Sequence, residues 1–125
     1  MHLIIKPTGL CNFNCKFCSA HNLDIKHPSD HKVPDKIKNL ILKLKPDSLI
    51  ITGGEPLMQP DFLIELFTLA KEKNIHTCID SSGIAYYPDN APLISKFDTL
   101  MTLTDLVMLD IKHIDPEKHR ELTLQ

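Results

Sequence analysis

Residues 48–56 of the chain read SLIITGGEP. The run opens with apolar, β-branched residues, which are typical of a strand buried on both faces of a sheet. Two glycines follow at once, and they allow the backbone to pass close to a ligand. The run therefore predicts a buried strand over Ser48–Thr52 that ends in a loop with space for a bound molecule.

An alternation of strand and helix continues on both sides of this run. Further strands are expected at Leu3–Lys6, His76–Asp80 and Leu106–Ile111. The second and third of these have the apolar character of strands buried on both faces. Helices are expected at residues 34–44, 61–73 and 92–101, with a fourth that starts at Asp115. This order favours parallel strands joined by right-handed crossovers.

The length of the chain limits this architecture. Its 125 residues hold four strand–helix units, whereas a closed eight-fold barrel needs roughly 200 residues or more. We therefore expect one α/β domain over residues 1–125, either a small open sheet or part of a larger barrel. An open sheet of this kind exposes the edge of its last strand. In both cases ligands gather at the C-terminal ends of the strands.

Composition excludes several classes of protein. Apolar residues make up 42% of the chain, and the net charge is −2, which argues against nucleic acid or an anionic membrane as a main partner. The sequence has no apolar run long enough for a transmembrane helix and no signal-peptide pattern at its start. We expect a cytoplasmic, reducing location, where the four cysteines indicate metal or redox chemistry rather than disulfides.

Three of the cysteines lie together just after the first expected strand, in the run CNFNCKFC at residues 11–18. The thiolates of Cys11, Cys15 and Cys18 can bind three irons of a [4Fe–4S] cluster and leave the fourth iron open. Phe17 would shield such a cluster from water. His21 follows three residues later, so a Cys3His zinc site is an alternative on spacing alone. Spacing favours the cluster over zinc.

Polar residues and glycines follow each of the other expected strands. Alone, each set also has a simpler reading: a turn, a packed methionine, or a solvated pair of charges. Because parallel strands end at one edge of a sheet, we expect these sets to meet there with the cysteines. The candidate residues are Gly53, Gly54, Glu55, Asp80, Ser81, Asp110 and Lys112, whereas Met108, within the last expected strand, reads on its own as a packed core residue.

The C-x3-C-x2-C motif, with an aromatic residue before its last cysteine and Gly-Gly-Glu-Pro about 35 residues further on, resembles the radical SAM superfamily. The resemblance implies a [4Fe–4S] cluster on the three cysteines. It also implies S-adenosylmethionine, whose amino group Gly53, Gly54 and Glu55 would contact. The fold that it implies is a partial (βα) barrel of six units, of which this chain holds about four.

From about residue 56 onward, the chain resembles the glycyl-radical-enzyme activases, in particular over residues 76–83 and 104–112. Residues 1–58 resemble other, shorter radical SAM proteins more closely. The activase resemblance implies that a glycyl-radical enzyme, such as pyruvate formate-lyase, is the partner. An electron donor such as flavodoxin would reduce the cluster.

The same resemblance assigns roles to the later strand ends. Asp80, Ser81 and Met108 would hold a monovalent cation together with the carboxylate of S-adenosylmethionine. Asp110 and Lys112 would lie beside S-adenosylmethionine and the glycine loop of the partner.

The resemblance implies reductive cleavage of S-adenosylmethionine to a 5′-deoxyadenosyl radical, which abstracts a hydrogen atom from a backbone glycine of the partner. Two alternatives stay open. One is a radical SAM enzyme that acts on a small molecule, similar to the carboxy-deazaguanine synthases. The other is a catalytically incomplete fragment that binds zinc or an iron–sulfur cluster.

Overall fold

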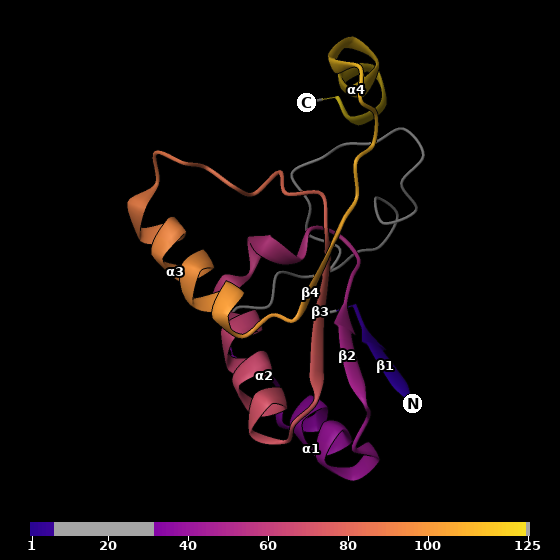
Figure 1. The fold of residues 1–125 in the computed structure, drawn as a ribbon, viewed down its shortest axis with the longest axis vertical. Coiled ribbons are helices and arrows are strands. Elements are labelled where there is room, and N and C mark those ends of the chain that lie inside the picture. Colours follow the sequence, from indigo (N-terminus) through magenta and orange to yellow (C-terminus); the bar gives the residue numbers. More distant parts are fainter. Residues whose placement is uncertain (7–31, 125) are drawn as a thin grey trace.

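A computed structural model describes residues 1–6 and 32–124 of the chain, and Figure 1 shows its fold. Strands and helices alternate there as the sequence predicts. In chain order the elements are β1 (His2–Ile5), α1 (Asp35–Leu44), β2 (Ser48–Ile51), the short 3-10 helix η2 (Pro56–Met58), α2 (Pro60–Glu72), β3 (His76–Ser81), α3 (Ala91–Thr102), β4 (Leu106–Leu109) and α4 (Pro116–Thr123).

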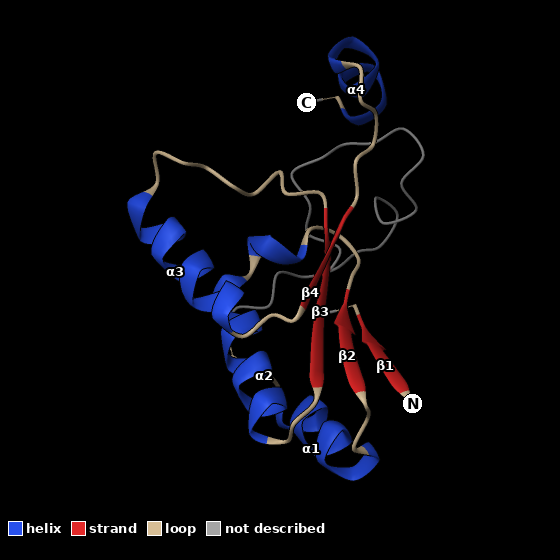
Figure 2. Cartoon of the chain, in the orientation of Figure 1, coloured by secondary structure: helices blue, strands red, loops and turns tan. Residues whose placement is uncertain are grey.

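The strands form one parallel sheet in the order β1-β2-β3-β4. The register places Ile5, Ile51, Ile79 and Val107 side by side across it. Figure 2 shows the strands running in the same direction, and no further described strand pairs with β1 or β4 at the two edges. The expected α/β class and parallel topology are therefore confirmed, and the barrel is not closed within the described residues.

Helix starts follow capping rules that the sequence already contains. The Asp115 carboxylate accepts hydrogen bonds from the amides of Glu117 and Lys118, at 2.9 and 3.0 Å. At the start of α3, the Asn90 side chain accepts one from the Leu93 amide at 3.2 Å. Short polar side chains stabilise helix starts in this way because the first amides of a helix have no partner within it.

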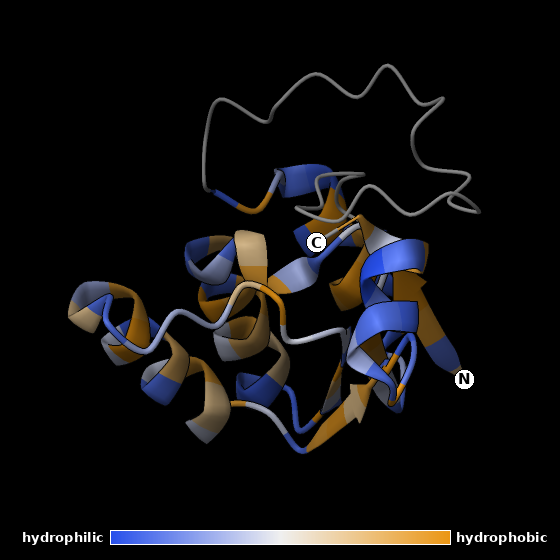
Figure 3. Cartoon of the chain, turned by 90° about the horizontal axis from the view of Figure 1, so that it is seen from above, coloured by the Kyte–Doolittle hydropathy of each residue, from blue (hydrophilic) through white to orange (hydrophobic). Residues whose placement is uncertain are grey.

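Helices α1, α2 and α3 lie on one face of the sheet (Figure 1). Seen from above in Figure 3, hydrophobic segments run along the strands and recur on the helices beside them. Alternate strand residues point to this covered face. The core that they form with the helices includes Leu49, Ile51, Ile79, Leu63, Leu66, Phe67 and Leu100. The opposite face of the sheet, which we call the open face, carries no helix among the described residues.

The longest described helix, α2, has 13 residues. Among the helices that the structure describes, none has the length and apolar character needed to cross a membrane.

Strand β4 corrects one expectation. Its apolar sequence predicted burial on both faces, but all four of its residues are exposed, Leu106 by 48% and Leu109 by 60%. Within the described part, no strand pairs with its outer edge, and α4 lies beyond the end of the sheet rather than against β4 (Figure 1). The expected exposure of the last strand's edge is thus confirmed.

The start of β4 is fixed by Asp105. Its carboxylate forms an ion pair with Lys71 of α2 and accepts hydrogen bonds from Thr77, at 2.8 Å from the amide and 3.1 Å from the hydroxyl. The bond from Lys71 and then that from the Thr77 amide lower the pKa of Asp105 from 3.8 to about 2. This group therefore joins α2, β3 and β4 through a charge that stays ionised at neutral pH.

Because folding lowers the pKa of Asp105, its contribution is present above pH 4 and is lost as the pH falls through about 2. We expect Asp105→Asn to lower the free energy of unfolding at pH 7 by about 1 kcal/mol, a value reduced for the partial exposure of the group. The difference from wild type should shrink between pH 5 and pH 2. Urea titrations across this range measure it, with exposed Asp89→Asn as control. An equal difference at every pH would contradict the assignment.

Candidate functional site

The C-terminal ends of the strands meet at one rim of the sheet (Figure 2). The predicted cluster ligands Cys11, Cys15 and Cys18, with Phe17 and the alternative ligand His21, lie outside the described residues. In the sequence they belong to the connection between β1 and α1. Their ligand roles stay predictions. The loops after β2, β3 and β4 are described, and they form the rest of the site.

Both glycines after β2 need the conformational freedom that glycine provides. Gly53 has φ +84° and Gly54 has φ +58°, in the left-handed region that other residues rarely adopt. A Cβ atom on Gly53 would also lie 3.1 Å from Cγ of Lys6. The aliphatic carbons of the Lys6 side chain therefore pack against Gly53 where another residue would carry its Cβ atom. The glycine loop lies close to the end of β1 as a result.

Glu55 is 1% exposed, and four donors of the chain itself surround its carboxylate. Oε1 accepts from the Ser81 hydroxyl at 2.6 Å and from the Leu57 amide at 3.1 Å. Oε2 accepts from the amide and the hydroxyl of Ser82, at 3.0 and 2.5 Å. The side chain that the sequence suggested for binding an ammonium group is thus held between two loops of the fold.

Ser82 is a site residue that the sequence analysis missed. The Asp-Ser-Ser-Gly run at the end of β3 was expected at the rim, but for Ser82 it suggested a turn and no role of its own. In the structure the turn does form, because the Gly83 amide donates to the Ser81 hydroxyl at 2.9 Å. The signal that could have shown more is Glu55, an acidic residue just after the neighbouring strand β2. A buried carboxylate needs hydrogen-bond donors, and both serines supply them.

Asp80 lies on the open face, whereas the next residue, Ser81, points toward the helices, since side chains of a strand alternate between faces. Oδ2 of Asp80 accepts a hydrogen bond from the hydroxyl of Thr52 at 2.8 Å. Met108 is the register partner of Asp80 on β4 and is 40% exposed. The structure therefore brings Asp80 and Met108 together, adds Thr52 to them, and separates the Ser81 hydroxyl from them.

Asp110 and Lys112 form an ion pair just beyond β4. The Asp110 amide also donates to the backbone oxygen of Ser81 at 2.8 Å, which fixes this segment to the end of β3. This geometry fits both interpretations of the sequence: a pair of charges in solvent, and a pair of charges that contacts a ligand. The pair extends the charged part of the rim from β3 to β4.

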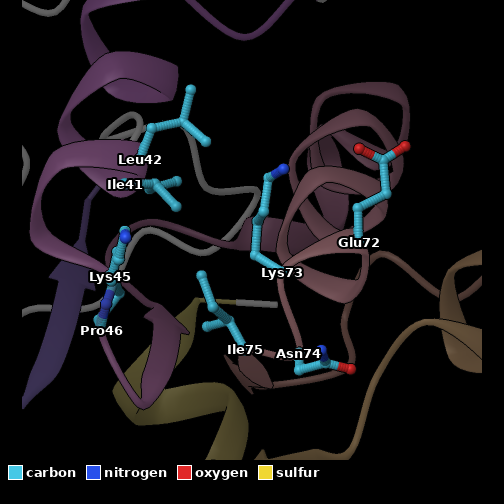
Figure 4. Close-up of a pocket in the computed structure, with 8 residues that line it drawn as sticks. All are labelled: Ile41, Leu42, Lys45, Pro46, Glu72, Lys73, Asn74 and Ile75. Carbon is cyan, nitrogen blue, oxygen red and sulfur yellow. The ribbon is translucent and has the colours of Figure 1, made fainter.

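Of two further cavities, one lies away from this rim and the other borders it through Ser81 and Gly83. The larger, about 460 Å³, is lined by residues from the C-terminal ends of α1 and α2, including Ile41, Lys45, Lys73 and Ile75 (Figure 4). A cavity of about 310 Å³ lies beside α3 and β4, lined mainly by apolar residues such as Phe97 and Leu109. The first lies at the opposite end of the strands from the converging loops. Since parallel sheets bind ligands at the carboxyl ends of their strands, volume alone does not mark the site.

Among the described residues, no group of three or more histidine, cysteine or acidic side chains could hold a metal ion. Cys78, the cysteine within that part of the chain, is buried and unpaired. Burial raises the pKa of its thiol, and the charge of Asp80 raises it further. Cys78 therefore stays a protonated packing residue, as the sequence suggested.

An open parallel sheet, glycine and acidic loops at its carboxyl edge, and a three-cysteine motif after β1 define a cofactor-binding α/β protein of the radical SAM class. The sequence pattern of the radical SAM superfamily matches residues 5–123, so the chain belongs to that superfamily. Membership implies a [4Fe–4S] cluster and S-adenosylmethionine as cofactors, in agreement with the cysteine and glycine motifs.

Curated relatives show which members of the superfamily the chain is similar to. It is 43% identical over 122 residues to the pyruvate formate-lyase-activating enzyme of Listeria monocytogenes, a match that covers 90% of this chain and 48% of the relative. The enzyme of that name from Staphylococcus epidermidis is 42% identical over 123 residues, with 90% and 47% covered. The chain thus spans about half the length of these curated relatives. A match over 90% of the chain also extends the activase resemblance well into residues 1–58.

Solved structures agree on the fold. Streptococcus suis SuiB bound to S-adenosylmethionine superposes with a TM-score of 0.70 at 25% identity, covering 97% of this chain and 27% of SuiB. The same enzyme bound to precursor peptide SuiA gives 0.72 at 22% identity, with 97% and 26% covered. The likeness shows that the four strand–helix units share the fold of about a quarter of SuiB.

Proposed function

We propose that the chain forms the cofactor-binding half of a glycyl-radical-enzyme activase that acts on pyruvate formate-lyase. The observation that carries this proposal is the 43% identity to a pyruvate formate-lyase-activating enzyme across 90% of the chain. A fold-level likeness alone would leave the reaction open. The single domain over residues 1–125 is part of this proposal.

The donor set fits an iron–sulfur cluster with one open iron. Three cysteines within eight residues supply three thiolates, which leaves one iron for a ligand. When bound, the cluster supplies the electron that cleaves S-adenosylmethionine reductively and so begins hydrogen-atom abstraction. The chain would hold the cluster through Cys11, Cys15 and Cys18 and would keep water from it with Phe17.

S-adenosylmethionine would lie across the rim on the open face. Gly53 and Gly54 present backbone without side chains, so polar backbone groups of this loop can reach the methionyl amino group. Asp110 and Lys112, which hold each other in an ion pair, would orient the ligand and the glycine loop of the partner. These residues bind and position; the cofactors carry the chemistry.

A monovalent cation would bind at Asp80 and Met108 on the open face. Oxygen atoms suit such a hard ion, and Thr52 adds a hydroxyl beside Asp80 at 2.8 Å. The Ser81 hydroxyl lies on the other face, bonded to Glu55. A contribution from Ser81 would therefore come from its backbone oxygen, which already accepts from Asp110.

The proposed partners are a glycyl-radical enzyme such as pyruvate formate-lyase and an electron donor such as flavodoxin. Cluster assembly requires reduced cysteines, and the cytoplasm stays the proposed location on this ground.

Anaerobic reconstitution with iron and sulfide, followed by reduction and electron paramagnetic resonance with and without S-adenosylmethionine, tests the proposal. We expect a [4Fe–4S]⁺ signal that changes when S-adenosylmethionine is added. Addition of pyruvate formate-lyase should then give a glycyl-radical signal. A cluster signal that ignores S-adenosylmethionine would refute the cofactor-binding role. Bound zinc without a cluster would support the Cys3His alternative.

A further inference from the structure

We infer that Glu55 is a positioning residue: together with Ser81 and Ser82 it forms a buried brace that fixes the path of the Gly53–Gly54 backbone. The inference rests on the proposed function in one respect, that this glycine loop receives S-adenosylmethionine. It assigns a role to Ser82 and gives Glu55 a role other than direct contact with the ligand.

The chemistry of the contacts around Glu55 supports this positioning role. All four groups that surround the Glu55 carboxylate are donors, and each oxygen accepts one backbone N–H and one hydroxyl. An ionised carboxylate is an acceptor at both oxygens, and bonds to a charged acceptor are stronger than neutral ones. With 1% of the residue exposed, there is little room left for an ammonium group of a ligand.

The place of the brace in the fold supports the same role. Glu55 directly follows Gly54 and precedes η2, whose first turn its own side chain caps through the Leu57 amide at 3.1 Å. Through Ser81 and Ser82 the same side chain is bound to the end of β3. The Glu55 side chain therefore binds the segment after the glycines both to η2 and to the end of β3.

The two glycines need contacts of this kind to hold one conformation. Gly53 and Gly54 sit at positive φ, and glycine moves between backbone conformations more easily than any other residue. Such a loop binds a ligand well only if other contacts select its conformation beforehand, since ordering it at the moment of binding costs affinity. The brace provides this selection without touching the ligand.

The test compares Ser82→Ala, which removes one hydroxyl donor, with Ser82→Thr, which keeps it. Thr99→Ala on α3 is the control, because it also removes a hydroxyl bond, at 3.1 Å to the Ser95 carbonyl, but lies outside the site. Two quantities are measured: hydrogen exchange of the backbone amides within residues 53–58, where all but Pro56 carry one, without ligand, and the Kd of the reconstituted chain for S-adenosylmethionine.

We expect Ser82→Ala to speed exchange over residues 53–58 by about tenfold and to raise the Kd by a similar factor, as expected for one bond lost from a charged acceptor. Ser82→Thr should restore both values, and Thr99→Ala should change neither. The thermal midpoint of each variant shows whether an effect is confined to the loop.

The outcomes separate this inference from the proposed function. A wild-type chain that does not bind S-adenosylmethionine would refute the function, while the exchange data would still decide whether the brace orders the loop. Unchanged exchange in Ser82→Ala would overturn the inference. Faster exchange with an unchanged Kd would overturn it too, because the loop path would then not matter for binding.

Discussion

Glu55→Gln should lower the free energy of unfolding by about 3 kcal/mol, although the two side chains have nearly the same size. Each carboxylate oxygen of Glu55 faces a backbone N–H, one from Leu57 and one from Ser82. Whichever way the glutamine amide is turned, its NH2 group faces one of these N–H groups. Hydroxyls can rotate to accept, but a backbone amide cannot, so a buried donor loses its partner, which costs about 1–3 kcal/mol beyond the weakened charged bonds.

Urea unfolding followed by circular dichroism measures this loss, and Glu72→Gln is the matched control. Glu72 ends α2 and is exposed, so the same chemical change there should alter stability by less than about 0.5 kcal/mol. Equal unfolding midpoints for Glu55→Gln and wild type would show that the four donors do not depend on the carboxylate.

Cys15→Ala should abolish cluster assembly. A [4Fe–4S] cluster held by three thiolates that loses one of them keeps only two anchors, and water cannot replace a thiolate as a lasting iron ligand. After anaerobic reconstitution we expect bound iron and the brown absorbance of the cluster to fall at least about tenfold. Iron and sulfide assays on the desalted protein measure the loss.

Cys78→Ala provides the control for general damage by a cysteine substitution. Cys78 is 3% exposed in β3, where its thiol is protonated and packed, so its removal should leave the iron content unchanged. A full cluster in Cys15→Ala would show that the motif at residues 11–18 does not hold the metal. Loss of iron in both variants would indicate that fold damage, rather than ligation, controls assembly.

Local sequence signals were sufficient for the helices and strands. The apolar run at β2 and the Asp115 cap before α4 predicted elements that the structure places within one or two residues of expectation. Such signals act over a few neighbours, so they do not depend on the rest of the fold. Burial of β4 was predicted wrongly, since burial depends on what covers a strand and not on its own residues.

The contacts within the site were harder to foresee. Glu55 and Ser82 are 27 residues apart, and only the parallel pairing of β2 with β3 brings their loops together. The placement of Asp80 and Ser81 on opposite faces is different, because strand alternation alone implies it. Their common assignment to one cation came from the resemblance, which implied the hydroxyl of Ser81 as a ligand. The structure instead bonds that hydroxyl to Glu55 on the other face.

The exposed edge of β4 affects how the protein behaves in a test tube. No described strand pairs with the outer edge of β4, and Leu106, Val107 and Leu109 are open to water. Another extended chain can add to such an edge. Solutions of the chain should therefore become turbid on concentration or long storage. Dilute handling, or a soluble fusion partner, would protect the sample long enough for spectroscopy under argon.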